Sequence, residues 1–195
     1  MYKELYPKII DALVEDGYII IKNALHVELA NKLKEFAKNE ENFQRAGISN
    51  TALHVDNNKR RDKIHWLDED SASQSEFLSF TRGLQESINK ELYMSLSYYE
   101  SHFAIYEEGD FYETHLDAFK NSKNRVVTTV YYLNEDWTNK DGGELIVYNE
   151  EDKLLATVKA EANTLVVFLS EKFPHEVLLA KRKRFSIAGW FRIDK

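Results

Sequence analysis

Two histidines and an aspartate in the second half of this chain have residue types and spacing that suit a metal site. His115 and Asp117 stand two positions apart in the segment HLD, and His175 follows in the segment PHEV. Two imidazoles and one carboxylate form a facial ligand set, which leaves open positions on a non-haem Fe(II) for a co-substrate and O2. If residues 111–117 form a strand, His115 and Asp117 share one face of it. We therefore predict that these three residues bind iron in an oxygenase.

An arginine after the second histidine strengthens this interpretation. Arg184 ends the basic run KRKR and begins the segment RFSIAGWF. Its planar guanidinium can grip the far carboxylate of a ketoacid that chelates the metal. Arg184 faces inward if Ser186 and Ala188 do, and we expect Trp190 to join that face only after a bulge. The run before it, 181–183, is expected to form a solvated turn.

The other histidines receive less specific predictions. His54 belongs to a second H-x-D triplet, but it lies in a polar segment without strand character, so we interpret it as loop. His26 is expected near a helix start and His102 in the core or on a sheet face. His65 precedes a tryptophan and has no predicted role.

Composition limits the kinds of partner. The 195 residues carry a formal charge of −7, which disfavours nucleic acid because phosphate binding needs a basic surface. The chain contains no cysteine, which excludes disulfides and thiolate metal sites. We see neither a secretory leader nor a membrane-spanning run, and we expect a cytoplasmic protein without membrane partners.

Periodicity predicts the elements that must position the candidate ligands. Apolar residues recur at helical spacing in three segments, and one short apolar run reads as a buried strand. A polar stretch over 44–70 is predicted to be a long loop, and such loops are usually functional or disordered. The predicted helices are 3–16, 26–39 and 71–94, and the early strand is 18–21.

From residue 97 onward, short strand-like segments alternate with turn signals such as the pair Gly142-Gly143, whose tight turn requires positive φ. Eight strands at this spacing predict a double-stranded β-helix, a jelly-roll or cupin-like sandwich. We predict an α+β fold with the N-terminal helices packed on one sheet. It forms a single domain, 1–195, in which 1–96 supply helices and a substrate loop and 97–195 supply the catalytic core. The predicted strands are 97–106, 111–117, 125–133, 144–148, 154–160, 164–169, 175–179 and 184–193.

These segments also carry a family resemblance. The blocks YEEGDFYETHLDAF, RVVTTVYYLNEDW, DGGELIVY and FPHEVLLAKRKRFSIAGWF occur in this order. They resemble the 2-oxoglutarate- and Fe(II)-dependent oxygenases, and more narrowly the prolyl-hydroxylase branch that includes hypoxia-sensing enzymes and bacterial relatives. The resemblance covers about residues 99–192. A shorter block, RRDKIHWL at 60–67, resembles the segment before the substrate-binding loop of the same branch.

The resemblance implies roles by position. His115, Asp117 and His175 would bind iron, while Arg184 and Tyr132 would hold the C5 carboxylate of 2-oxoglutarate. The remaining co-substrate pocket would comprise Tyr106, Thr128, Leu145 and Trp190. On the substrate side, Arg125 and Asp62 would link a mobile loop to the sheet.

The implied reaction uses Fe(II), 2-oxoglutarate and O2 to hydroxylate a C–H bond, with release of succinate and CO2. Ascorbate would serve as a reductant. The implied substrate is a prolyl residue in a protein or peptide, and a translation factor is the first candidate. Three alternatives stay open: a hydroxylase of a free amino acid or small molecule, a non-catalytic cupin-like binding module, and a zinc hydrolase with the same ligand types.

Overall fold

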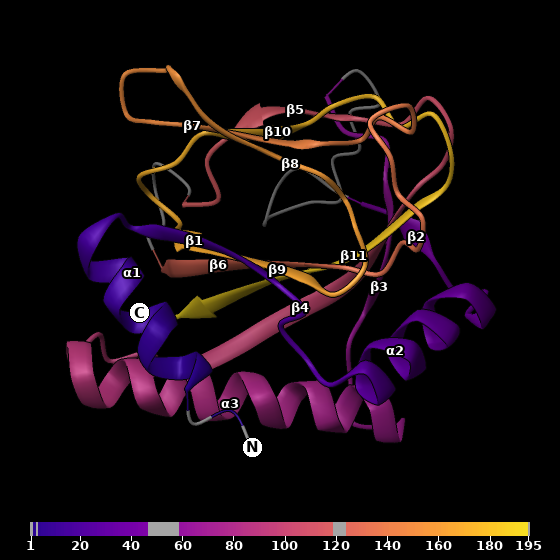
Figure 1. The fold of residues 1–195 in the computed structure, drawn as a ribbon. Coiled ribbons are helices and arrows are strands. Elements are labelled where there is room, and N and C mark those ends of the chain that lie inside the picture. Colours follow the sequence, from indigo (N-terminus) through magenta and orange to yellow (C-terminus); the bar gives the residue numbers. More distant parts are fainter. Residues whose placement is uncertain (1, 3, 47–58, 119–123, 195) are drawn as a thin grey trace.

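Three helices cover one side of a β-sandwich in the computed structural model, which describes residues 2, 4–46, 59–118 and 124–194 (Figure 1). The predicted helices are confirmed to within two residues at each end. α3 begins after Ser71, whose side chain accepts a hydrogen bond from the Gln74 amide, and it ends at Tyr93 in the left-handed conformation. The helices are α1 (Leu5–Glu15), α2 (Val27–Asn39) and α3 (Ala72–Leu92).

The larger sheet has seven strands, all joined antiparallel. Their spatial order is β1 (Tyr18–Lys22), β9 (Thr164–Leu169), β6 (Arg125–Tyr132), β11 (Arg184–Arg192), β4 (Tyr98–Tyr106), β3 (Lys63–Trp66) and β2 (Gln44–Arg45). The smaller sheet has four, in the order β5 (Tyr112–His115), β10 (His175–Val177), β7 (Leu145–Tyr148) and β8 (Leu154–Val158).

Alternating side chains give the larger sheet two buried faces. Val127, Tyr131 and Val167 face the helices and join their apolar side chains in one core cluster. Val130 and Val166 face the smaller sheet and belong to a second cluster. The predicted jelly-roll sandwich with helices packed on one sheet is therefore confirmed.

The predicted loop over 44–70 is wrong in part. Residues 44–45 and 63–66 form strands that extend the larger sheet beyond β4, and β1 lies at its opposite edge. The larger sheet thus draws strands from both sides of residue 96. His54 and residues 47–58 lie outside the described residues, so the predicted substrate loop is not described there.

The last strand is more regular than expected. β11 pairs with β4 in unbroken register from Arg184 opposite Tyr106 to Arg192 opposite Tyr98. Its alternate residues Arg184, Ser186 and Trp190 therefore share the inner face without the predicted bulge. The only shift in its pairing with β6 comes after Phe191.

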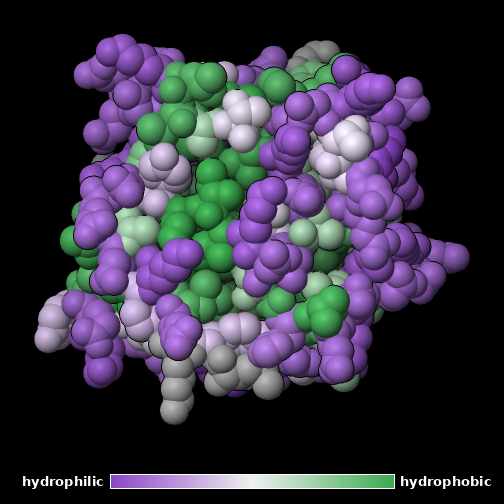
Figure 2. All heavy atoms as spheres, viewed as in Figure 1, coloured by the Kyte–Doolittle hydropathy of each residue, from purple (hydrophilic) through white to green (hydrophobic). Residues whose placement is uncertain are grey.

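The surface of the face drawn in Figure 2 is hydrophilic at its rim and apolar through its centre. No helix in the described part of the chain is long and apolar enough to cross a membrane.

Candidate metal centre

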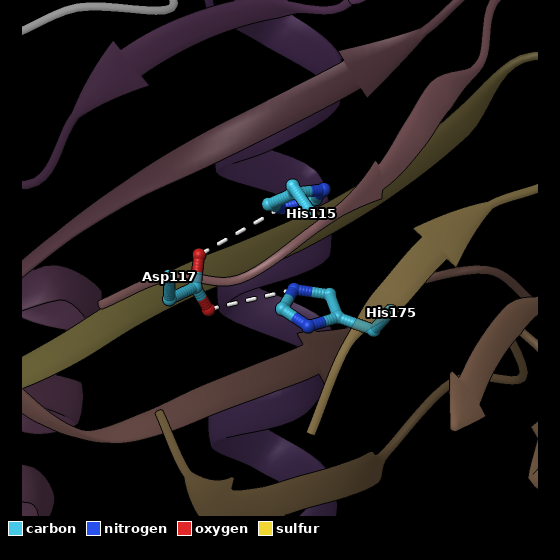
Figure 3. A group of neighbouring side chains, drawn as sticks. All are labelled: His115, Asp117 and His175. Atoms are coloured by element: carbon cyan, nitrogen blue, oxygen red, sulfur yellow. Dashed lines mark ion pairs between the residues drawn. The ribbon is translucent and has the colours of Figure 1, made fainter. Parts of the chain in front are cut away.

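The three predicted ligands lie together between the two sheets. His115 ends β5 and pairs directly with His175, the first residue of β10. One ligand atom from each of His115, Asp117 and His175 lies within 4.8 Å of the others. The Nε2 atom of His115 is 3.8 Å from Oδ1 of Asp117, and Nε2 of His175 is 3.4 Å from Oδ2. Figure 3 shows all three side chains pointing toward one another.

Backbone contacts orient both imidazoles. Nδ1 of His115 lies 2.8 Å from the carbonyl oxygen of Glu113, and Nδ1 of His175 lies 2.9 Å from that of Phe173. A carbonyl oxygen only accepts, so each Nδ1 carries the proton and each Nε2 presents a lone pair. Burial and the neighbouring His175 imidazole lower the pKa of His115 to about 3, which keeps this ring neutral. Two imidazoles and a carboxylate fit a divalent transition metal.

Asp117 reaches this centre from outside a strand. We predicted it on a strand face, but β5 ends at His115 and Asp117 follows two residues later. The side chain is buried, which alone would raise its pKa, but electrostatic interactions with His175, His115 and the cationic Arg125 hold the pKa below its usual range. Asp117 is therefore ionised and able to bind a cation.

Arg184 lies at the deep end of the same space and is only 1% exposed. Its Nε donates to the carbonyl oxygen of Gly143 at 2.9 Å, and its Nη1 donates to Oγ of Ser186 at 3.2 Å. The rings of Tyr106 and Tyr132 flank its guanidinium at 4.8 and 5.0 Å. These partners are neutral, and within the described residues no carboxylate forms an ion pair with Arg184.

One cavity connects the triad with Arg184. The other predicted site residues that line it are Tyr106, Thr128, Leu145, Trp190, Arg125 and Asp62. Tyr132 is fully buried beside Arg184, and its hydroxyl has no hydrogen-bond partner in the described part of the chain. The structure thus brings the predicted site residues together, while their roles stay predictions.

Sequence reasoning missed two side chains that stack next to His115, those of Tyr112 and Arg60. Tyr112 stacks on the His115 ring with centroids 3.7 Å apart, and the guanidinium of Arg60 lies 4.6 Å from the Tyr112 ring centre. Arg60 also donates to both carboxylate oxygens of Asp62, at 2.6 and 2.9 Å. The block RRDKIHWL contains both Arg60 and Asp62. Their two-residue spacing, which puts both on one face of a strand, could have indicated the ion pair.

His102 was also missed as a cavity residue, although its burial on a sheet face was predicted. It pairs with Ala188 across β4 and β11, and its ring lies between those of Trp66 and Trp190. Burial and the positive charge of Arg60 lower its pKa to about 3, so the ring is neutral.

The remaining histidines lie away from the centre. His26 precedes α2, as expected, and His65 lies on β3 near the rings of Phe36 and Phe43. Neither lines the cavity.

Comparisons with known proteins agree with this geometry. A family profile described as the 2OG-Fe(II) oxygenase superfamily matches residues 101–192. A prolyl-4-hydroxylase from Pseudomonas putida superposes with a TM-score of 0.89 and is 34% identical, covering 96% of this chain and 99% of that one. The chain belongs to the 2OG-Fe(II) oxygenase superfamily.

Other members of the superfamily resemble this one in different ways. A Trichoplax adhaerens prolyl hydroxylase, solved with a hypoxia-inducible factor peptide fragment, superposes with a TM-score of 0.86 at 27% identity, covering 96% of this chain and 89% of that one. The hypoxia-inducible factor prolyl hydroxylase of Caenorhabditis elegans is 29% identical over 96% of this chain and 28% of its own length. Human Egl nine homolog 1 is 36% identical over 43% of this chain and 20% of its own length. The chain thus spans about a quarter of these two curated relatives.

Proposed function

We propose that this superfamily member is an Fe(II)- and 2-oxoglutarate-dependent dioxygenase that hydroxylates a prolyl residue in a protein or peptide. His115, Asp117 and His175 would bind Fe(II), and the deep part of the cavity would bind 2-oxoglutarate. When bound, the metal and co-substrate would supply the oxidation of a C–H bond, with release of succinate and CO2.

The environment of Arg184 is the observation that carries this proposal. A guanidinium has five N–H donors, and Arg184 commits two of them to neutral acceptors. A buried charge without a counter-charge costs free energy, and a carboxylate at this position would offset that cost. The unpartnered hydroxyl of Tyr132 would donate to the same carboxylate. These groups suit the C5 carboxylate of 2-oxoglutarate. One end of 2-oxoglutarate would bind the metal, and the C5 carboxylate at the other end needs a cation.

The remaining residues would shape the two ends of the cavity. Leu145, Val130 and Val177 line it with apolar side chains, which would exclude water from the co-substrate. Trp190 stands beside the triad, and the guanidinium of Arg125 lies 3.7 Å from its ring centre. Arg125, Arg60 and Asp62 line the cavity near the triad, where the substrate would bind.

The substrate class is proposed from relatives of similar architecture. The proteins from Pseudomonas putida and Trichoplax adhaerens are described as prolyl hydroxylases, and the second was solved with a peptide. A translation factor is the first candidate that the family resemblance implies. Membership of the superfamily argues against a cupin-like module and a zinc hydrolase, and a free amino acid is the alternative substrate that the test includes.

The test is iron-dependent turnover with identified products. The apo-protein would be loaded anaerobically with Fe(II) and 2-oxoglutarate, then exposed to air with proline-containing peptides, purified translation factors or free proline. Succinate would be quantified, and mass spectrometry would locate an added oxygen atom. We expect oxidised peptidyl proline and no product from His175→Ala.

His65→Ala is the matched control, because it removes a histidine outside the cavity. Full turnover by His175→Ala, or a requirement for neither iron nor 2-oxoglutarate, would overturn the proposal. If free proline were oxidised in preference to every peptide, the protein would still be a dioxygenase, but its proposed substrate would be wrong.

A further inference from the structure

The Asp117 carboxylate accepts a hydrogen bond from a hydroxyl group of the opposite sheet, and a second hydroxyl group bonds to the first. The β5 ladder ends at His115, so no strand pairing fixes the position of Asp117. Thr128 on β6 places Oγ1 2.8 Å from Oδ2 of Asp117. Ser170, the residue after β9, places its Oγ 2.9 Å from the same Thr128 oxygen. Both hydroxyl side chains are buried, at 1% and 0% exposure.

The geometry gives the direction of these hydrogen bonds. The Thr128 hydroxyl donates its single proton to Oδ2 of Asp117. The Thr128 oxygen can then only accept from Ser170, which makes Ser170 the donor at the start of the chain. A hydroxyl that receives a hydrogen bond becomes a stronger donor. The relay therefore runs from Ser170 through Thr128 to the carboxylate.

Ser170 also holds the backbone beside Asp117. Its carbonyl oxygen accepts from the Ala118 amide at 3.4 Å, and its own amide donates to the Val126 carbonyl at 3.0 Å. Ser170 is thus tied to β6 and to the residue that follows Asp117. The larger sheet thus positions Asp117, although Asp117 follows β5 of the smaller sheet.

We propose that Ser170 and Thr128 are positioning residues that orient the Asp117 carboxylate for metal binding. The proposal rests on the proposed function, because it assumes that Asp117 is a ligand. The hydrogen bond occupies one side of Oδ2 and favours binding through a single oxygen, which would keep positions open for the co-substrate and O2. Hydrogen-bond partners of ligands commonly contribute 10- to 100-fold to metal affinity.

The experiment measures Mn(II) binding to the full-length apo-protein by titration calorimetry, without 2-oxoglutarate or turnover. We expect Thr128→Val, which keeps shape and removes the donor, to weaken binding by about 10- to 100-fold. Thr128→Ser should restore most of the affinity. Ser170→Ala should give a smaller loss, and adding it to Thr128→Val should give no further loss, because Ser170 acts through Thr128.

Thr129→Val is the matched control. Thr129 is the next residue on β6 and is also buried. Its hydroxyl forms a hydrogen bond of 2.7 Å with the Tyr99 hydroxyl, on the face of the sheet that points away from the proposed metal ligands. It should bind Mn(II) like the wild-type protein. In the Co(II)-substituted protein, the visible absorption bands should change in Thr128→Val and not in Thr129→Val.

The possible failures are distinguishable. Wild-type affinity in Thr128→Val, beside a strong loss in Asp117→Ala, would overturn the relay alone. Wild-type affinity in Asp117→Ala would overturn the metal site and with it the proposed function. If Thr128→Val does not fold, equal Mn(II) affinity of Ser170→Ala and wild type would still overturn the relay.

Discussion

The side chain of Arg184 passes directly against Gly143 and donates its Nε hydrogen to that residue's carbonyl oxygen at 2.9 Å. Gly143 has a φ of +64°, and a Cβ added there would lie 2.9 Å from Cδ of Arg184. The glycine pair was predicted to form a tight turn, and the positive φ of Gly142 and Gly143 confirms it. The turn has a second consequence, because only glycine leaves room for the arginine.

Gly143→Ala tests this contact. The added methyl group would push Arg184 away from its place, and the left-handed backbone would cost about 1–2 kcal/mol of folding free energy. We expect weaker 2-oxoglutarate binding with Mn(II) affinity preserved. Calorimetric titration with each ligand separates the two effects. An unchanged affinity for 2-oxoglutarate would show that Arg184 tolerates the displacement or does not bind the co-substrate.

Arg184→Met and Arg184→Lys test the buried cation. Loss of one partner from a buried charge pair costs about 2–5 kcal/mol, so we expect Arg184→Met to bind 2-oxoglutarate at least roughly 30-fold more weakly. Arg184→Lys keeps the charge but loses the bidentate fork, so its affinity for 2-oxoglutarate should lie between those of the wild type and Arg184→Met.

The same Arg184→Met variant makes a prediction about stability. Without 2-oxoglutarate, the wild-type protein buries a guanidinium with neutral partners only, which is unfavourable. We expect the apo variant to melt at or near the wild-type temperature, and 2-oxoglutarate with Mn(II) to stabilise only the wild type. Calorimetric scans would contradict this if the variant melted far below the wild type.

His102 predicts a pH dependence of stability. Its folded pKa is about 3, against 6.5 for an ordinary histidine, so between these values the unfolded chain binds a proton that the folded chain does not. Above pH 6.5 the histidine is neutral in both states and does not lower the free energy of unfolding. As the pH falls from 6.5 toward 3, the free energy of unfolding decreases. His102→Gln should lower the slope by roughly 1 kcal/mol per pH unit in this window. Urea unfolding at several pH values measures the slope, and parallel profiles for the two proteins would refute the prediction.

Glu100 holds two arginines at the outer end of the cavity. Its Oε1 accepts from Arg125 at 3.0 Å and from Arg192 at 2.7 Å, and all three side chains are at most 21% exposed. Glu100→Gln removes the negative charge that both arginines contact, and we expect a loss of about 2–3 kcal/mol of unfolding free energy. Glu107→Gln is the matched control, because its pair with Lys183 is half-exposed and should contribute under about 1 kcal/mol. Equal effects of the two substitutions in urea unfolding would contradict this assignment.

The sequence by itself predicted the three candidate ligands and determined the class of fold. The H-x-D triplet, the later histidine and the arginine are residue types that the chemistry requires. Alternation of apolar residues predicted most strands, and apolar residues at helical spacing predicted all three helices. His115, His175 and Arg184 could be placed because each lies on a strand whose facing follows from local spacing. The early strands β2 and β3 were missed because they have only two and four residues and stand in a polar stretch, and because β3 pairs with β4, which is distant in the chain.

Only the tertiary structure decided how the site is supported. Thr128 and Ser170 are 42 positions apart, and no local pattern shows that they meet beside Asp117. Likewise, the stacking of Tyr112 on His115 and the neutral surroundings of Arg184 depend on side chains from different strands. Periodicity records which face of an element is buried, whereas the contacts across that face arise from how two sheets pack, and packing is a property of the whole chain.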